Sequence, residues 1–350
     1  AMIPLWMAPV AIACGNCFVL KPSERTPLTA NRLGELMLKS GLPEGVLSIL
    51  HGGKDCVNAL LEHPMVQSIS FVGSTPVARH VYSTGCANGK RVQAAGGAKN
   101  HVIVMPDAPL EATVNGVLNS AFGCAGQRCM AGSVAVAVGE AGDEFVERFQ
   151  STASKMVVGR TDIDSAAEMG PVITAQHRSR VFDYIGIGER EGANVRMDGR
   201  KVSIPDAPNG FFVGPTLIDH VQPETRIAKE EIFGPVLSVI RAKSLEEALA
   251  IGEKCEFGNG ATLFTKSGWA AREFKHRFNA GMIGINVGVP APLAWFPFTG
   301  WNGSFFGDLH IQGTESVAFY TQQRIVMNRW MEDDTLGSEV DPVWRHDRIS

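Results

Sequence analysis

The sequence has no long basic or acidic segment. Its net charge is −4 at neutral pH, from 32 Lys and Arg against 36 Asp and Glu. Because these charges are interspersed, no positive stripe is available to neutralise nucleic-acid phosphates. We therefore expect no nucleic-acid partner. The 350 residues are 45% apolar, enough for two domains with their own cores.

A disulfide framework is also missing. The seven cysteines are odd in number and scattered, which predicts free thiols in a reducing, cytosolic type of compartment. Cys14 and Cys17 form a CxxC pair, but a zinc site needs a second pair, and the nine histidines are dispersed. We expect this pair to pack in the core, and we expect no metal site.

No segment has the character of a membrane span. Residues 1–20 carry no charged side chain, and a transmembrane helix needs about 20 apolar residues. Pro4, Pro9, Gly15 and Asn16 interrupt this stretch, and no basic region precedes it as in a signal peptide. A buried helix that leads into a strand is the better interpretation, and no membrane partner is expected.

Short β-branched runs alternate with amphipathic helical patterns along the chain. Residues 17–22 and 46–50 predict strands, and residues 26–41 between them predict a helix that Gly41 ends. A later helix is expected from about Leu110. Further strand patterns occur at 66–73, 91–97, 101–106, 133–139, 235–242 and 261–265. This order predicts an α/β fold with a parallel sheet and helices on both faces.

The Gly96–Gly97 pair is the expected domain boundary, since no repeat, low-complexity tract or long linker divides the chain. Residues 317–330 alternate like a strand, which needs a neighbour in the other domain or in another subunit. The last twenty residues are polar and irregular and predict a mobile tail. We predict an incomplete, Rossmann-like cofactor domain (1–97), an α/β catalytic domain (98–302) and a C-terminal segment with an oligomerisation strand (303–350).

The usual nucleotide fingerprints, GxGxxG and the Walker loop, are absent. Two strand ends offer an alternative: "KPSER" at residues 21–25 and "GST" at residues 73–75, the latter just before a helix. In open α/β sheets, cofactors bind at carboxyl ends of strands and at helix N-termini, where small residues let amides reach a phosphate. Taken alone, each motif is also compatible with a solvated turn or an ordinary helix cap.

A glycine-rich loop places Arg128 directly before Cys129. Gly123, Gly126 and Gly132 allow the backbone to approach a ligand closely, and a cation beside the thiol would favour the thiolate that attacks carbonyls. The loop therefore predicts a nucleophile. A small buried cysteine without chemistry is the alternative.

Six motifs in this order and spacing resemble the aldehyde dehydrogenase superfamily: "KPSER", "FVGST", "GGAKNH", "GQRCMAG", "KEEIFGPVLSV" and "PFTGWNGSFFGDLHIQGTESV". Over about residues 1–330 the chain resembles its CoA-acylating methylmalonate-semialdehyde dehydrogenase branch. The resemblance implies NAD as cofactor, coenzyme A as co-substrate, an aldehyde acid as substrate and a homo-oligomer, either dimer or tetramer. It also implies a cytoplasmic location in a bacterium or the mitochondrial matrix in a eukaryote.

The resemblance assigns cofactor contacts at the two strand ends. Lys21 and Glu24 are similar to the pair that binds the adenosine ribose hydroxyls, and Arg25 looks like a neighbour of that site. Ser74 after Gly73 is similar to the pyrophosphate contact. A carboxylate at Glu24 would repel a 2′-phosphate, which predicts NAD rather than NADP.

Three further residues receive roles in the same way. Cys129 resembles the catalytic nucleophile, with its backbone amide as one candidate oxyanion donor. Glu231 is similar to the glutamate that holds the nicotinamide ribose, and Phe233 to the ring that packs near it. The chain looks like a fragment, because the asparagine that supplies a second oxyanion donor in the family falls just before Ala1.

One position departs from ordinary aldehyde dehydrogenases, which read "ELGGK" with a glutamate that activates the deacylating water. Here its place is taken by Ala94 or Ala95, depending on whether the glycine pair or Lys99 anchors the match. General-base help is worth about 10²–10⁴-fold, and a thiol needs less of it than water, so coenzyme A is the expected acceptor. Another carboxylate serving as base remains the alternative.

Arg128 can grip a carboxylate through two parallel hydrogen bonds, which suits malonate and methylmalonate semialdehydes. The implied reaction is thioester formation on Cys129, decarboxylation, and release of propionyl-CoA or acetyl-CoA. Arg128 could instead pair with a protein acid or tune the thiol. The rival functions are a general aldehyde dehydrogenase that yields the free acid, and a catalytically incompetent partial chain.

Overall fold

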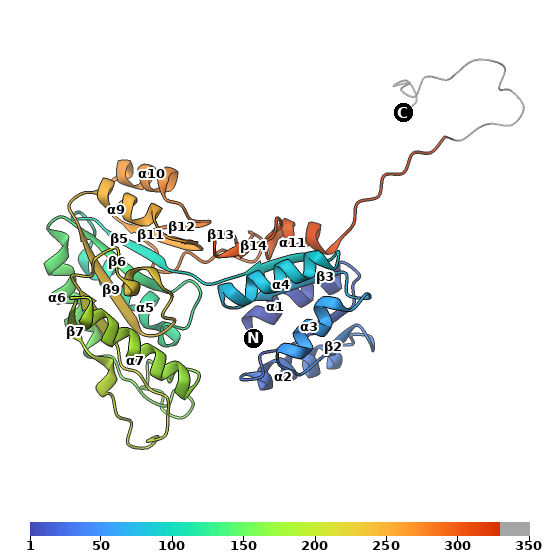
Figure 1. Cartoon of the computed structure of the whole chain (residues 1–350), viewed down its shortest axis with the longest axis horizontal. Coiled ribbons are helices and arrows are strands. Elements are labelled where there is room, and N and C mark those ends of the chain that lie inside the picture. The colour runs from blue at the N-terminus through green and yellow to red at the C-terminus, as the bar shows by residue number, and fades with distance from the viewer. Residues whose placement is uncertain (330–350) are drawn as a thin grey trace, which may run out of the picture.

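The structure is a computed structural model that describes residues 1–329. It has the predicted α/β architecture, with a large, mostly parallel sheet at one end and two small sheets at the other. Figure 1 shows the small sheets with α1 to α4 on the right and the large sheet with its helices on the left. The polypeptide crosses between the two ends after residue 95 and again near β13 and β14.

The chain begins, as predicted, with a helix that leads into a strand, but the helix is not buried as expected: only Met7, Ala8 and Ala11 are buried, and Met2 and Leu5 are exposed. Proline at the first position of the second helix suits a residue with a fixed φ and no N–H to donate. Gly41, at φ +95°, follows the end of that helix. Strands β1 and β2 pair in parallel. The elements are α1 (Met2–Ala13), β1 (Phe18–Leu20), α2 (Pro27–Lys39), β2 (Leu47–Ile49) and α3 (Lys54–Glu62).

The second small sheet has the strand order β14-β4-β3. Strands β3 and β4 are parallel and are joined by helix α4, while β14 is antiparallel to β4 and comes from late in the chain. The C-terminal part of the polypeptide therefore completes a sheet that the N-terminal part begins. The elements are β3 (Ser68–Val72), α4 (Thr75–Ala87), β4 (Arg91–Ala95) and β14 (Phe305–Phe306).

The large sheet has seven strands in the order β12-β11-β5-β6-β9-β8-β7. All neighbours are parallel except β7 and β8. Its central strands are runs of Val, Ile and Ala because both faces are buried. The strands are β5 (Asn100–Val104), β6 (Gly132–Val138), β7 (Asn194–Met197), β8 (Thr216–Asp219), β9 (Val236–Ala242), β11 (Gly260–Phe264) and β12 (Met282–Ile285).

Helices cover the large sheet on both faces. Helices α9 and α10 lie on one side, and α5 and α6, which pack on each other, lie on the other (Figure 1). The predicted helix near residue 110 is α5. The remaining elements are α5 (Leu110–Phe122), η1 (Gly123–Gly126), α6 (Ala141–Ala153), α7 (Ala175–Arg190), η2 (Gly199–Lys201), α8 (Arg226–Lys229), α9 (Leu245–Glu253), β10 (Phe257–Gly258), α10 (Gly268–Arg277), β13 (Trp301–Asn302) and α11 (Gly313–Tyr320).

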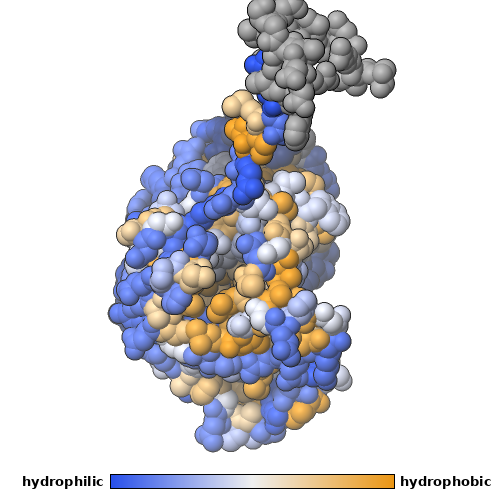
Figure 2. Space-filling view, turned by 90° about the vertical axis from the view of Figure 1, so that its right-hand side faces the viewer, coloured by the Kyte–Doolittle hydropathy of each residue, from blue (hydrophilic) through white to orange (hydrophobic). Residues whose placement is uncertain are grey.

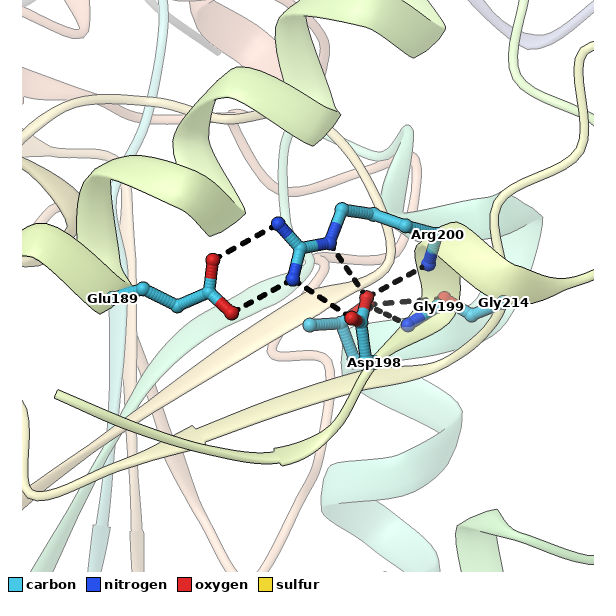
Figure 3. Close-up of polar contacts among 6 residues, drawn as sticks. Glu189, Asp198, Gly199, Arg200 and Gly214 are labelled. Carbon is cyan, nitrogen blue, oxygen red and sulfur yellow. Dashed lines mark hydrogen bonds and ion pairs between the residues drawn. The ribbon is translucent and has the colours of Figure 1, made fainter.

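An ion-pair network fixes the corner where β7 meets η2. Arg200 lies between two carboxylates, with nitrogen–oxygen distances of 2.8 Å to Glu189 of α7 and 2.7 Å to Asp198 (Figure 3). The Asp198 side chain also accepts from the Arg200 amide and so caps the short helix. The network holds the end of α7 against the antiparallel edge strand.

The prediction of a late strand was wrong for its first part. Residues 317–320 are the last turn of helix α11, and residues 321–329 form no strand within this single chain. Ile325, Val326 and Met327 are exposed within an otherwise polar segment. Figure 2 shows a small hydrophobic patch between the body and the grey atoms. Trp330 and the whole of the expected tail lie outside the described residues.

The CxxC pair does not pack in the core as expected. Cys14 is half-buried and Cys17 is exposed, because the pair spans the turn between α1 and β1. All seven cysteines are free thiols. Residues 1–329 contain no cluster of three His, Cys, Asp or Glu side chains able to hold a metal, and no helix there is both long and apolar enough to span a bilayer.

Candidate active site

The loop between α5 and β6 carries Cys129. Cys124 and Ala125 both adopt left-handed backbone, at φ 52°, and Gly126 follows at φ 69°. A Cβ on Gly126 would lie only 2.1 Å from the Gly234 carbonyl oxygen, so glycine is required for the close approach of the two backbones. The loop is therefore locked against the segment that leads into β9.

Four of the predicted site residues line one cleft at the amino ends of β5, β6 and β9. Cys129 and Arg128 come from the loop before β6, and Glu231 and Phe233 come from the segment between α8 and β9. Lys99 and Asn100 complete this wall from the start of β5. The fold thus brings together residues more than 100 positions apart, and their catalytic roles stay predictions.

Glu231 is held against the turn that joins β4 to β5. The Ala98 amide donates to Glu231 Oε1 at 2.9 Å, and a Cβ on Gly97 would lie 2.6 Å from Oε2. Burial raises the pKa of this carboxyl above its ordinary value, against the opposing effect of the Ala98 amide. The second glycine of the "GGAKNH" motif is therefore needed for the carboxylate to fit.

The neighbouring Glu230 anchors the same segment from the other side. Its carboxylate accepts from the Tyr184 hydroxyl and from the Arg226 guanidinium at 2.8 Å, while its backbone oxygen accepts from Lys99 Nζ at 2.8 Å. Arg226 is the main reason that the pKa of Glu230 falls to about 2. Burial lowers the pKa of Lys99 to about 8.

Helix α7 contributes three anchors from one face. His177 Nε2 donates to the backbone oxygen of Phe233 at 2.6 Å, and the Arg180 guanidinium donates to the backbone oxygen of Glu231 at 2.9 Å. With Tyr184, these residues have the spacing i, i+3, i+7 that places side chains on one helix face. The sequence analysis missed them, although this spacing of polar residues was the available signal.

The expected effect of a cation on the nucleophile was wrong. The Arg128 side chain is exposed, and its Nε donates to Cys124 Sγ at 3.2 Å rather than to Cys129. Burial is the main cause that raises the pKa of Cys129 to about 11, and the nearby Glu231 charge adds to it. Burial therefore favours the neutral thiol form of Cys129 in this structure.

The "KPSER" motif follows β1, as predicted, but it does not line the cleft. Lys21 Nζ donates to the backbone oxygens of Pro22 at 2.7 Å and Gly52 at 2.9 Å, and it lies 3.5 Å from the Glu24 carboxylate. The pKa of Glu24 is lowered, first by its own backbone amide and less by Lys21. Arg25 is exposed.

The "GST" motif joins β3 to α4. Ser74 is the exposed N-cap, and its hydroxyl makes no capping hydrogen bond, while Gly73 leaves no room for a Cβ next to Phe71. Thr75, the last residue of the motif, to which the sequence analysis gave no role, accepts from the Gly97 amide at 2.9 Å and donates to the Gly303 backbone oxygen at 3.0 Å. The helix N-terminus is thereby tied to the turn on which Glu231 rests.

The two alanines at the end of β4 face opposite sides. Ala95 packs in a cluster with Met130 that Cys129 borders, whereas Ala94 packs with Ala78 of α4. Both side chains are buried. Of the two alanines that could take the place of the family's glutamate, Ala95 is therefore the one on the side of the Cys129 thiol.

Comparisons with known proteins agree with this architecture. The aldehyde dehydrogenase family model matches residues 1–326. The malonate-semialdehyde dehydrogenase of Halalkalibacterium halodurans is 55% identical over 329 residues, which cover 94% of this chain and 67% of the relative.

Solved structures give the same result. The methylmalonate-semialdehyde dehydrogenase of Oceanimonas doudoroffii superposes with a TM-score of 0.93 at 51% identity, covering 95% of this chain and 68% of that one. A Sinorhizobium meliloti 1021 structure complexed with NAD gives a TM-score of 0.93 at 48% identity, with 95% and 67% covered. The chain belongs to the aldehyde dehydrogenase family.

Proposed function

We propose that the chain oxidises malonate or methylmalonate semialdehyde with NAD and passes the acyl group to coenzyme A after decarboxylation. The observation that carries this proposal is the cleft in which Cys129 and Arg128 lie together, next to an apolar cluster that contains Ala95, which cannot act as a base. The named substrates of the relatives support the same class of substrate.

The residues at the small sheets fit NAD. Lys21 and Glu24 present an ammonium and a carboxylate next to each other for ribose hydroxyls. Ser74 and the first amides of α4 have no side-chain acceptor, so they are free to receive a pyrophosphate. Glu231 and Phe233 would hold the nicotinamide end beside Cys129. The Sinorhizobium meliloti relative was solved with NAD, which supports this arrangement.

The chain's own residues carry the covalent chemistry. The Cys129 thiol gives its proton to Glu231, the carboxylate that lines the same cleft. The sulfur then attacks the aldehyde carbon. A C–S bond forms and the carbonyl electrons move to the oxygen, which the Cys129 amide stabilises. NAD, when bound, accepts the hydride from that carbon. The carbonyl re-forms as a thioester on Cys129.

Decarboxylation and release follow from the structure of this thioester. The bond to the β-carboxylate breaks, carbon dioxide leaves, and the electron pair passes to the thioester carbonyl as an enolate that is then protonated at carbon. The coenzyme A thiolate attacks the carbonyl, and the Cys129 thiolate leaves. Arg128, exposed at the edge of the cleft, would orient the carboxylate before it is lost.

The dependence of turnover on coenzyme A tests the proposal. Without coenzyme A we expect one burst of NADH per site and a steady state at least about 10²-fold slower, because no base is positioned for water at residue 95. Free acid formed at the same rate without coenzyme A would instead support a general aldehyde dehydrogenase. Glu231 favours that second candidate, since it is a carboxylate in the cleft with a raised pKa.

The role of Arg128 has a separate test. Arg128→Leu should raise KM for malonate semialdehyde about ten- to a hundredfold relative to propanal, the loss expected for a charge-assisted bidentate pair. The ratio between the two substrates is the decisive measurement, because any effect on the thiol slows both. An unchanged ratio would show that Arg128 does not bind the substrate carboxylate.

We also propose that the chain forms a homo-oligomer through residues 321–329. This segment leaves the body without a strand partner and exposes Ile325, Val326 and Met327. Light scattering on the protein, and on a Val326→Lys variant, tests the proposal. A monomeric wild type, or an assembly that the added charge does not weaken, would contradict it.

A further inference from the structure

Two buried amide side chains converge on the backbone carbonyl of Cys129. Asn100 Nδ2 donates to the Cys129 oxygen at 2.8 Å and to the Ala131 oxygen at 2.8 Å. Asn259 Nδ2 donates to the same Cys129 oxygen at 2.9 Å. Both asparagines are 5% exposed. One carbonyl thus accepts from two side chains that lie 159 positions apart in the sequence.

A hydrogen bond also connects the segments that carry the two asparagines. Asn100 is the first residue of β5, and Asn259 directly precedes β11, the neighbour of β5 in the sheet. The Gly260 amide donates to Asn100 Oδ1 at 3.1 Å. The pairing of β5 with β6 shifts register between Asn100 and His101, a bulge of the kind that redirects a side chain. The pair therefore forms a rigid bracket below the loop.

The two asparagines hold the peptide unit that joins Cys129 to Met130. The Cys129 carbonyl and the Met130 amide belong to one planar peptide, so fixing the oxygen also fixes the N–H. The amides of Cys129 and Met130 both favour the thiolate, against the burial that raises the pKa of this group. A carbonyl that accepts two hydrogen bonds also makes the N–H of its peptide a stronger donor.

We propose that Asn100 and Asn259 are positioning residues for the nucleophile: together they hold the Cys129–Met130 peptide in the one orientation that aims the sulfur and its neighbouring amides into the cleft. The inference rests on the proposed role of Cys129. Neither asparagine touches substrate or cofactor in this assignment, so both act through the backbone of the loop.

A single amide resonance reports the bracket directly. The dipeptide Cys-Met occurs once in the chain, at residues 129–130. Labelling the full-length protein with carbonyl-¹³C cysteine and ¹⁵N methionine therefore gives one carbonyl-to-amide cross-peak. Asn259→Leu removes one donor at similar volume and should move the Cys129 carbonyl carbon upfield. A peak that stays in place would overturn the proposal.

The rate of the NADH burst shows whether the geometry matters for the reaction. Asn259→Leu removes the hydrogen bond to the Cys129 oxygen and a weaker one from Nδ2 to Met130 Sδ at 3.0 Å. It should slow the burst about three- to tenfold and leave NAD affinity within about twofold of wild type. A burst that does not slow, or a loss that lies entirely in NAD affinity, would overturn the positioning role even if the peak moves.

Asn286→Ala is the matched control. Asn286 likewise bonds backbone with its amide, to the Thr265 oxygen and amide at 2.9 Å each, but at the carboxyl ends of β11 and β12, opposite the cleft. It should lower the melting temperature without moving the peak or the burst. Equal slowing in this control would reduce the asparagines to a structural role.

Two further measurements keep the outcomes separate. Asn100→Leu removes three hydrogen bonds and should have the larger effect, but Asn259→Leu alone decides the matter if that variant does not fold. A Cys129→Ser variant that keeps the burst would overturn the proposed function itself. That result is distinguishable, because the amide peak of the asparagine variants would still shift.

Discussion

The two ends of the molecule offer their candidate residues in different ways. At the small sheets, Lys21, Glu24 and Ser74 follow the carboxyl ends of strands; Glu24 and Ser74 are exposed, and Lys21 bonds the Pro22 and Gly52 carbonyls. At the large sheet, Cys129 and Glu231 precede the amino ends of strands and contact residues more than 25 and 130 positions away. The cleft thus faces a sheet from its amino side.

This difference bears on the rule for ligand sites in α/β proteins, which covers the strand ends of the small sheets and not the loop that carries Cys129. Carboxyl ends of parallel strands are where ligands usually bind, and the "KPSER" and "GST" motifs lie there. The nucleophile loop needs a different support, because its position is set by buried contacts from neighbouring strands. The proposed cofactor contacts at the small sheets depend on side chains near the surface. The arrangement around Cys129 instead depends on contacts among several strands of the large sheet.

Replacing the thiol should give the largest effect. Cys129→Ser is expected to lower the rate of NADH formation about 10³-fold or more, since a serine hydroxyl in this cleft has no comparable nucleophilicity. Cys124→Ser, on the same loop, should keep most of the activity. If Cys129→Ser forms NADH within about tenfold of the wild-type rate, Cys129 is not the nucleophile.

A pair of glycine variants compares the packing of the two ends. Gly126→Ala should lower the free energy of unfolding by about 3 kcal/mol or more, because it combines a left-handed backbone with a clash against Gly234. Gly89→Ala has a similar φ, +71°, with no atom near the new Cβ, and should cost about 1 kcal/mol. Urea unfolding measures both. Equal losses would mean that the loop can relax.

The cofactor preference tests the exposed end. Glu24→Gln removes a carboxylate whose lowered pKa keeps it charged at neutral pH, and should improve NADP affinity about fivefold relative to NAD. Titration of both cofactors by fluorescence measures the ratio. Tighter binding of NADP than NAD by the wild type would contradict the assignment of Glu24 to the ribose.

The smallest effect concerns pH. The pKa of Glu230 is lowered to about 2, so the stabilisation from its pairing is present above the ordinary carboxyl pKa and is lost as the pH falls toward 2. Arg226→Met should lower the free energy of unfolding only slightly at pH 6.5, because both side chains are largely exposed. That cost should shrink further at pH 3.

Arg32→Met, which breaks the exposed pair with Glu35 on α2, is the control for that measurement. Urea unfolding at pH 6.5 and pH 3 should show a larger pH-dependent change for Arg226→Met than for Arg32→Met. A larger cost at pH 3 than at pH 6.5 would give the wrong sign and would exclude Glu230 as the group responsible.

The sequence predicted most of the strands and the nucleophile loop, because both depend on local patterns. Short apolar, β-branched runs between helical patterns predicted β5, β6, β9 and β11, and the glycine spacing around Cys129 indicated the loop. The strand expected at residue 317 failed since its first residues complete a helix that packs against α1. Alternation over a few residues did not distinguish these two structures.

The sequence by itself determined the fold class, the reactive residue types and the family to which the motifs belong. Only the tertiary structure decided what surrounds the thiol: the Arg128 side chain bonds Cys124, burial raises the pKa of Cys129, and Ala95 rather than Ala94 belongs to the apolar cluster that Cys129 borders. These features depend on desolvation and on contacts such as those of Asn100 and Asn259, which arise only once distant strands lie side by side.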